Sequence, residues 1–247
     1  MSRDTAAIIL SAGLGKRMKS DLPKVLHKLN GKYIVDYVID NVKKAGISNI
    51  VLVIGHKYEL MQKALADRGV KFAIQRPQLG TGHAVQVALP VLGDFNGDLL
   101  VLCGDMPLVS TKTITELLKM HRKLKAEAVV LTVRLNEPKN YGRIVRDEDG
   151  FLKAIVEYRD ADRKTRLINE VNTGAYCFSS RGLRSVLKEL KTDNAQAEYY
   201  LTDTIALFKK RGLKVAALVS DDPNEGLGIN SKEELTRIES IIKELKG

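Results

Sequence analysis

The sequence predicts an α/β fold in which helices flank a mixed, mostly parallel sheet that carries an additional β-hairpin layer. Two observations lead to this prediction. Short apolar runs alternate with amphipathic segments along the first half, and a D-G dipeptide joins two alternating runs in the second half. No linker, repeat or low-complexity stretch divides the 247 residues. We therefore expect a single domain, residues 1–247, with a core of substantial size.

The first 135 residues contain five continuous apolar runs, which are typical of strands buried on both faces of a sheet. They are AAIIL (6–10), IVLVI (50–54), VKFAI (70–74), DLLVLC (98–103) and AVVLTV (128–133). The amphipathic segments between them predict helices over Tyr33–Ala45, Tyr58–Asp67 and Thr113–Leu124. Because strands and helices alternate at this spacing, we expect βαβ crossovers.

The remainder of the chain has a different pattern. It predicts, in chain order, a hairpin, a further strand and two helices: 143–157, 171–178, 181–190 and 199–210. Ser231 and Glu234 have the spacing of a capping box, so a last helix is expected over residues 231–247. Its apolar stripe consists of Leu235, Ile238, Ile242 and Leu245.

The composition excludes several classes of protein. The formal charge is +10, but aromatic residues make up only 5%, tryptophan is absent and the basic residues are scattered, so no nucleic-acid partner is expected. No apolar run is long enough to span a membrane, and the first is too short for a signal peptide. Cys103 and Cys177 each lie in an apolar run, as expected of buried thiols in a reducing cytoplasm.

The stretch LSAGLGKRMKSDLPKVLH (10–27) fits neither common phosphate-loop pattern. A Walker A loop needs glycine at position 10 and serine or threonine at position 17, where this chain has Leu10 and Arg17. The dinucleotide pattern needs a third glycine where Met18 stands. The loop therefore holds a phosphate in some other way, or it is a glycine turn with surface lysines.

The residues of this loop favour an anion site at the end of the first strand. Gly13 and Gly15 let backbone N–H groups approach a ligand, and the carboxyl ends of parallel strands are where ligands bind in such sheets. Lys16, Arg17 and Lys24 add positive charge within fifteen residues. We expect a phosphate there.

Six motifs together resemble the sugar-1-phosphate nucleotidylyltransferase family, in its N-acetylglucosamine-1-phosphate uridylyltransferase form. In chain order they are LSAGLGKRMKSDLPKVL, QRPQLGTGHA (75–84), GDMPL (104–108), YGRI (141–144), NTG (172–174) and NAQAEYYLTD (194–203). The resemblance extends over nearly the whole chain. It implies a Rossmann-like nucleotide-diphospho-sugar transferase fold, with a nucleotide-binding half (1–110) and a sugar-binding half (111–230).

The resemblance implies that N-acetylglucosamine 1-phosphate attacks the α-phosphorus of UTP, which yields a UDP-sugar of the kind used for cell-wall precursors. Arg17 and Lys24 are then the catalytic residues, because nucleotidyl transfer depends on positioning and charge neutralisation. Gln75 reads the uracil, since an amide can both donate and accept. The implied nucleotide contacts are Leu10, Ala12, Gly13, Gly15, Lys24, Gln75, Gly80, Thr81, Gly104 and Asp105. His83 is interpreted as structural, because an ionised phosphate needs no general base.

The implied cofactor is Mg²⁺, with Asp105 and Asn230 as its protein ligands. Asp105 follows a predicted strand, and Mg²⁺ takes one or two protein oxygens beside phosphates and water. Read without the resemblance, both residues are also compatible with helix caps. The implied sugar-binding residues are Gly142, Glu157, Asn172, Tyr200 and Thr202, although Glu157 alone also fits a solvated hairpin end.

Some properties stay open at this stage. Alternative functions are transfer to glucose 1-phosphate, use of dTTP, or a non-catalytic nucleotide-sugar sensor. Lys16 and Cys103 stand where the family usually has threonine and tyrosine. Bifunctional members continue into an acetyltransferase β-helix, whereas this sequence stops at IIKELKG, so no acetyltransferase activity is expected of it and the oligomeric state is not assigned.

Overall fold

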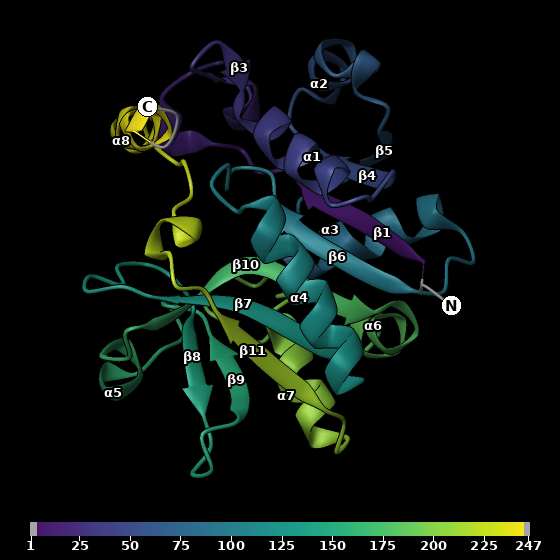
Figure 1. Ribbon diagram of the computed structural model, residues 1–247, viewed down its shortest axis with the longest axis vertical. Coiled ribbons are helices and arrows are strands. Elements are labelled where there is room, and N and C mark those ends of the chain that lie inside the picture. Colours follow the sequence, from purple (N-terminus) through teal and green to yellow (C-terminus); the bar gives the residue numbers. More distant parts are fainter. Residues whose placement is uncertain (1–3, 245–247) are drawn as a thin grey trace.

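The computed structural model describes residues 4–244, with the side chain of Lys16 excepted. Within this range one nine-stranded sheet has the strand order β11-β7-β10-β6-β1-β4-β5, and β8 and β9 extend from β10 (Figure 1). The strands are β1 Thr5–Leu10, β4 Asn49–Ile54, β5 Lys71–Ile74, β6 Asp98–Cys103, β7 Ala128–Arg134, β8 Arg143–Arg146, β9 Leu152–Val156, β10 Glu170–Ser179 and β11 Val215–Val219. A short ribbon, β2 Lys28–Leu29 with β3 Lys32–Tyr33, stands apart from this sheet.

Along the path β11-β7-β10-β6-β1-β4-β5 six strands run parallel to one another, and β10 runs opposite to them. It runs antiparallel to both β6 and β7. Tyr176 of β10 faces Val101 of β6, so the first residues of β10 reach past the carboxyl end of β6. The sheet therefore brings β10 to the same edge as the carboxyl ends of β1, β4 and β6, and the mixed, mostly parallel sheet of the prediction is confirmed.

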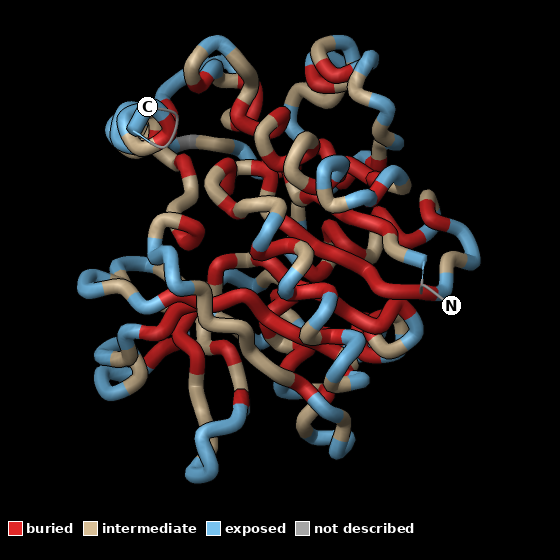
Figure 2. Tube along the Cα trace, in the orientation of Figure 1, coloured by how far each residue is buried: buried red, intermediate tan, exposed pale blue. Residues whose placement is uncertain are grey.

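Helices cover both faces of the sheet because side chains alternate along each strand. Ala7 and Ile9 point toward α1, α2 and α4, whereas Ala6 and Ile8 point toward α3, α6 and α7. The helices are α1 Ile34–Lys44, α2 Tyr58–Ala64, α3 Thr81–Ala88, α4 Thr111–Leu124, α5 Arg163–Arg166, α6 Ser180–Leu187, α7 Asp203–Lys210 and α8 Lys232–Glu244. Figure 2 shows the buried centre of the strands and the exposed hairpin tip. No helix within residues 4–244 is long and apolar enough to cross a membrane.

The last helix packs on the opening part of the chain. Ile238 and Ile242 of α8 contact Met18, Leu29 and Ile34, so α8 lies beside β3 (Figure 1). The predicted capping box is confirmed, because the Glu234 backbone donates to the Ser231 hydroxyl at 3.2 Å and the Ser231 backbone donates to the Glu234 carboxylate at 3.1 Å. Leu245, the last member of the predicted stripe, lies outside the described residues.

Several boundaries differ from the prediction. The helix expected over 199–210 begins only at Asp203. The Tyr199 amide donates instead to Leu79 O in the loop before α3, and the Leu201 amide donates to Oγ1 of Thr81, the first residue of α3. The helix expected over Tyr58–Asp67 ends at Ala64, and a 3₁₀ turn follows. The hairpin is confirmed as β8 and β9, but α3 and β11 were not predicted.

Candidate active site

The glycine-rich loop after β1 borders a cavity of about 550 Å³ at the carboxyl edge of the sheet. Its strand pairing ends at Ser11, whose amide donates to Val53 O at 2.9 Å. The amides of Ala12, Gly13, Leu14 and Gly15 have no hydrogen-bond acceptor among residues 4–244. Four consecutive unpaired N–H donors beside a cavity form a concave site that suits the oxygens of a phosphate.

The two glycines of this loop serve different purposes. Gly15 has φ +61°, and a Cβ there would lie 2.9 Å from Lys24 Cβ, so glycine allows the loop to close against Lys24. At Gly13 a Cβ would meet nothing within 4 Å, so packing does not require glycine at that position. The missing side chain at Gly13 leaves the backbone open to a ligand.

Three predicted residues from distant parts of the chain meet at one point. Lys24 Nζ donates to the Asp105 carboxylate and, at 2.9 Å, to Asn230 Oδ1. Asp105 follows β6, and its carbonyl accepts from the Ile229 amide at 2.9 Å, which fixes the loop that carries Asn230. The backbone N–H of Asn230 in turn donates to the Glu234 carboxylate at 2.7 Å. The resemblance placed these side chains in one site, and the structure brings them together.

Asp105 and Asn230 fit a divalent metal by their chemistry. A carboxylate oxygen and an amide oxygen converge on one cationic group, the ammonium of Lys24, so both can share a single cation. In the described part of the chain no group of three or more His, Cys, Asp or Glu side chains is arranged to hold a metal ion. Two protein oxygens suffice for Mg²⁺, which completes its shell with phosphates and water. A metal bound there must compete with Lys24 for the same two oxygens.

The predicted base-reading residue is deeply buried. Gln75 is 3% exposed, and its amide nitrogen lies 2.9 Å from Gly80 O and 3.1 Å from His83 Nδ1. A second glutamine, Gln78, donates to Ala12 O at 2.7 Å and so joins this wall of the cavity to the glycine-rich loop. Gln78 was not predicted as a site residue, although it stands in the same motif as Gln75.

The predicted sugar-binding residues form a second cluster around the β8–β9 hairpin. Glu157 accepts a hydrogen bond from Thr202 Oγ1 at 3.2 Å, and a Cβ on Gly142 would lie 3.4 Å from both Glu157 oxygens. Asn172 at the start of β10 uses its side chain internally, because Nδ2 donates to Tyr176 Oη at 2.7 Å and Oδ1 accepts from the Gly174 amide at 3.0 Å. The second Nδ2 hydrogen has no acceptor among residues 4–244 and is available to a ligand.

Burial changes the acidity of this second cluster. Desolvation raises the pKa of the Glu157 carboxyl, and the charges of Asp203, Asp160 and Glu198 raise it further, while the Thr202 hydroxyl opposes the shift. The pKa values of Asp203 and Glu198 are raised as well, mainly by burial. A ligand that donates hydrogen bonds, such as a sugar hydroxyl, would therefore stabilise the ionised form of these carboxylates.

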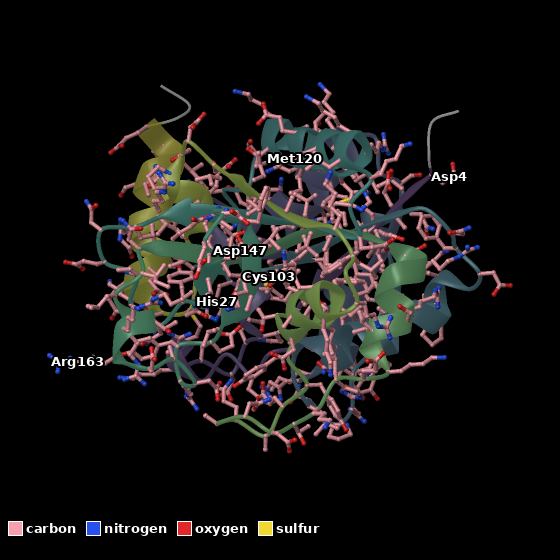
Figure 3. All side chains as sticks on the ribbon, turned by 90° about the horizontal axis from the view of Figure 1, so that it is seen from below. Asp4, His27, Cys103, Met120, Asp147 and Arg163 are labelled. Atoms are coloured by element: carbon pink, nitrogen blue, oxygen red, sulfur yellow. The ribbon has the colours of Figure 1, made fainter. Side chains whose placement is uncertain are left out.

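Cys103 lies between the two clusters. It lines the 550 Å³ cavity, its thiol is 3.7 Å from Gly174 O, and Figure 3 shows it near the middle of the molecule while Arg163 projects from the edge. Burial and the nearby Asp105 charge raise the pKa of the Cys103 thiol to about 12. The thiol is therefore neutral and unsuited to nucleophilic attack.

Not every predicted residue borders the cavity. Its lining includes the predicted nucleotide contacts except Gly104, together with the unpredicted Gln78, Gln196 and Glu198. The lining includes neither Asn230, which reaches the site through Lys24, nor any of the five predicted sugar-binding residues. Tyr200 is buried, and burial raises its hydroxyl pKa to about 12. A larger cavity of about 620 Å³ near Thr5 and Arg122 contains no residue of the motifs.

A comparison with family models matches residues 7–204 to the MobA-like NTP transferase domain. The match covers more than half of the chain. The chain belongs to the MobA-like NTP transferase family. The glycine-rich loop, Lys24, Gln75 and Asp105 lie inside the matched range, whereas Asn230 of this NTP transferase lies beyond it.

Proteins named bifunctional protein GlmU resemble this NTP transferase along most of its length. The GlmU of Acetivibrio thermocellus is 46% identical over 237 residues, which are 96% of this chain and 51% of that protein. The GlmU of Geotalea uraniireducens is 47% identical over 239 residues, which are 96% of this chain and 52% of that protein. The NTP transferase spans about half the length of these relatives.

The fold also matches a solved structure. The crystal structure of UDP-glucose pyrophosphorylase complexed with UDP-glucose has a TM-score of 0.77 to this NTP transferase. The likeness covers 98% of this chain and 99% of the other at 18% sequence identity. The predicted α/β fold of the nucleotide-diphospho-sugar transferase type is thereby confirmed.

Proposed function

We propose that the chain transfers a uridylyl group from UTP to N-acetyl-α-D-glucosamine 1-phosphate and releases pyrophosphate, with Mg²⁺ as cofactor. The observation that carries this proposal is the meeting of Lys24, Asp105 and Asn230 beside the unpaired amides of the glycine-rich loop. The motif resemblance and the GlmU relatives support the choice of substrates. A cytoplasmic location belongs to the proposal, since both cysteines stand in apolar runs, as buried thiols of proteins in a reducing compartment do. The oligomeric state is not part of it.

In the proposed reaction an oxygen of the sugar phosphate forms a bond to the α-phosphorus of UTP. The bond from that phosphorus to the bridging oxygen breaks, and pyrophosphate leaves with the electron pair. The nucleophile is already ionised, so no residue has to remove a proton. The protein's task is to orient two polyanions and to neutralise the charge that develops on the phosphoryl oxygens.

Each nucleotide-side residue has a role in this scheme. The amides of Ala12 to Gly15 hold phosphate oxygens, and Arg17 places positive charge at the cavity wall. Asp105 and Asn230 would hold the Mg²⁺, which supplies charge neutralisation at the phosphates when bound. Lys24 then exchanges its contacts with Asp105 and Asn230 for phosphate oxygens, where its charge acts most strongly in the transition state.

The sugar-side residues would select the acceptor. Glu157 is suited to accept hydrogen bonds from sugar hydroxyls, because it is half-buried and Thr202 is its one hydrogen-bond donor among residues 4–244. The Gly142 amide has no acceptor among the described residues and is available to the acetamido carbonyl, beside the remaining amide hydrogen of Asn172. This set of donors and acceptors suits a neutral N-acetylated sugar.

The proposal is tested by measuring pyrophosphate release with Mg²⁺ over a matrix of four nucleoside triphosphates and several sugar 1-phosphates. We expect turnover with UTP and N-acetylglucosamine 1-phosphate well above every other pair. A preference for glucose 1-phosphate or dTTP would reject the proposed substrates in favour of a related nucleotidylyltransferase. UTP binding without turnover on any pair would instead indicate a sensor.

A further inference from the structure

The amide group of Gln75 is held in one orientation by two acceptors. Its nitrogen lies 2.9 Å from Gly80 O and 3.1 Å from His83 Nδ1. A backbone carbonyl can only accept a hydrogen bond, so the atom facing Gly80 O must be the amide nitrogen and not the oxygen. The contact with Gly80 thus settles which end of the Gln75 amide points into the protein.

The same reasoning fixes the proton on His83. The Gln75 nitrogen has two hydrogens, one of which goes to Gly80 O, and the other points to His83 Nδ1. Nδ1 must therefore carry a lone pair, and the ring is the neutral tautomer with its hydrogen on Nε2. Burial lowers the pKa of His83, which favours this neutral form. The Tyr199 ring, 6.5 Å away between ring centres, is the aromatic neighbour of the imidazole.

With both amide hydrogens engaged, only the Gln75 oxygen is left for a ligand. Gln75 Oε1 has no hydrogen-bond donor among residues 4–244, and Gln75 lines the 550 Å³ cavity. We propose that His83 is a positioning residue for base selection: by accepting from the Gln75 nitrogen it presents Gln75 Oε1 as a fixed acceptor. This inference rests on the proposed function and deepens it.

The chemistry of the bases determines what such an acceptor selects. Uracil and thymine carry an N3–H, which donates to Gln75 Oε1, whereas cytosine has an unprotonated N3 that would face it lone pair to lone pair. To bind cytosine the amide has to flip, and the flip loses the bonds to Gly80 O and His83 Nδ1 together. His83 thus acts against cytidine nucleotides without touching the base.

The inference is tested by equilibrium binding of UTP, CTP and dTTP at a fixed Mg²⁺ concentration, with no sugar phosphate present. We expect the native protein to bind UTP on the order of a hundredfold more tightly than CTP. His83→Leu removes the acceptor, and we expect the ratio of CTP to UTP dissociation constants to fall about tenfold. That change is the equivalent of 1.4 kcal/mol.

Two further variants separate positioning from stability. His83→Asn keeps an oxygen acceptor near the place of Nδ1, so we expect it to restore most of the discrimination. Gln86→Ala is the matched control on α3, because Gln86 donates at 2.7 Å to Leu187 O, which does not line the 550 Å³ cavity. We expect Gln86→Ala to lower thermal stability and to leave the CTP to UTP ratio unchanged.

The outcomes distinguish this inference from the proposed function. An unchanged ratio in His83→Leu, or an equal fall in Gln86→Ala, would overturn the role of His83 while the proposed reaction stands. Native protein that binds no nucleotide would reject the proposed function itself. Affinity for dTTP should follow that for UTP in every variant, because both bases carry N3–H, and a separate response of dTTP would also overturn the inference. With turnover as the readout, His83→Leu should raise the KM for UTP more than it lowers kcat.

Discussion

The two clusters at the carboxyl edge of the sheet differ in charge and in the way they are built. The proposed nucleotide side consists of unpaired backbone amides with Arg17 and Lys24, and it is donor-rich and cationic. The proposed sugar side contains Glu157 and Asp203, carboxyls whose pKa values burial has raised. Glu198, whose pKa is raised in the same way, lies at the border and lines the 550 Å³ cavity. One side is made for anions and the other for neutral groups that donate hydrogen bonds.

Under the proposed function, this contrast would orient a sugar phosphate in one direction only. Its phosphate is attracted to the cationic side and repelled by the carboxylates, while its hydroxyls find acceptors on the acidic side. The two sides also differ in how many hydrogen-bond partners the protein gives to their charged groups. An ammonium that bridges two oxygens is satisfied in the protein alone, whereas a buried carboxylate with one hydroxyl donor is not.

The largest effect is expected at Lys24, where the cationic side can be disrupted by one change. Lys24→Ala should reduce kcat about 10²- to 10³-fold, because it removes a charge that acts mainly in the transition state. It should also tighten binding of Mn²⁺, used as a spectroscopic probe without nucleotide, since Asp105 and Asn230 lose their competing ammonium. Turnover within a factor of two of the native protein would contradict the assignment. Lys28→Ala, an exposed lysine nearby, is the control.

A smaller effect is expected at Glu157, where substitution should weaken binding of the sugar phosphate and raise the stability of the protein. Glu157→Gln should raise the KM for the sugar phosphate about tenfold, because a charged acceptor is lost, and should change kcat less. It should also stabilise the protein at neutral pH. The folded pKa of Glu157 is raised above its usual 4.5, so the folded protein binds more protons than the unfolded chain between those two pKa values. Native stability therefore falls as pH rises through that window.

The measurement for Glu157 is thermal unfolding of both proteins at several pH values. The stability gain of Glu157→Gln should be present above the raised pKa and should vanish below about pH 4.5, where the native side chain is protonated in both states. Glu148→Gln, at the exposed hairpin tip, should show neither effect. A variant that is less stable than the native protein at pH 7 would mean that the ionised carboxylate stabilises the fold.

The parts of the fold that sequence could predict are those that local pattern determines. The buried strands, the D-G hairpin and the capping box at Ser231 follow from periodicity and turn chemistry. The unpredicted helix α3 begins at Thr81 between two glycines, which read locally as a loop, and its start is held by the Tyr199 carbonyl, which accepts from Gly82 at 2.7 Å. Contacts between segments so far apart leave no periodic trace.

The site shows the same division. The glycine-rich loop and Asp105 were expected at strand ends from the residues themselves, whereas Asn230 depended on the resemblance. Sequence could not predict that the Lys24 ammonium bridges Asp105 and Asn230, because that contact joins residues 81 and 206 positions apart. Likewise the link from Gln75 to His83 depends on the turn between β5 and α3. The roles of these residues stay predictions.

The smallest effect on turnover is expected where a residue supports the site without facing it. Glu225 is 3% exposed and accepts hydrogen bonds from the Ser110 amide and from the Thr113 and Ser220 hydroxyls, in the turn that leads to Asn230. Glu225→Gln weakens charge-assisted bonds, so the free energy of unfolding should fall by about 1–3 kcal/mol.

Because Asn230 sits five residues beyond this anchor, a looser turn should raise the half-saturating Mg²⁺ concentration several-fold and leave kcat at saturating Mg²⁺ nearly unchanged. Glu233→Gln, an exposed neighbour, serves as the control. A fall in kcat as large as that of Lys24→Ala would mean that Glu225 affects charge neutralisation and does not only support the Asn230 loop. The proposed separation of a cationic nucleotide side from an acidic sugar side would then be wrong for this residue. A change in Mg²⁺ requirement alone would instead show that the metal-binding loop belongs to the cationic side.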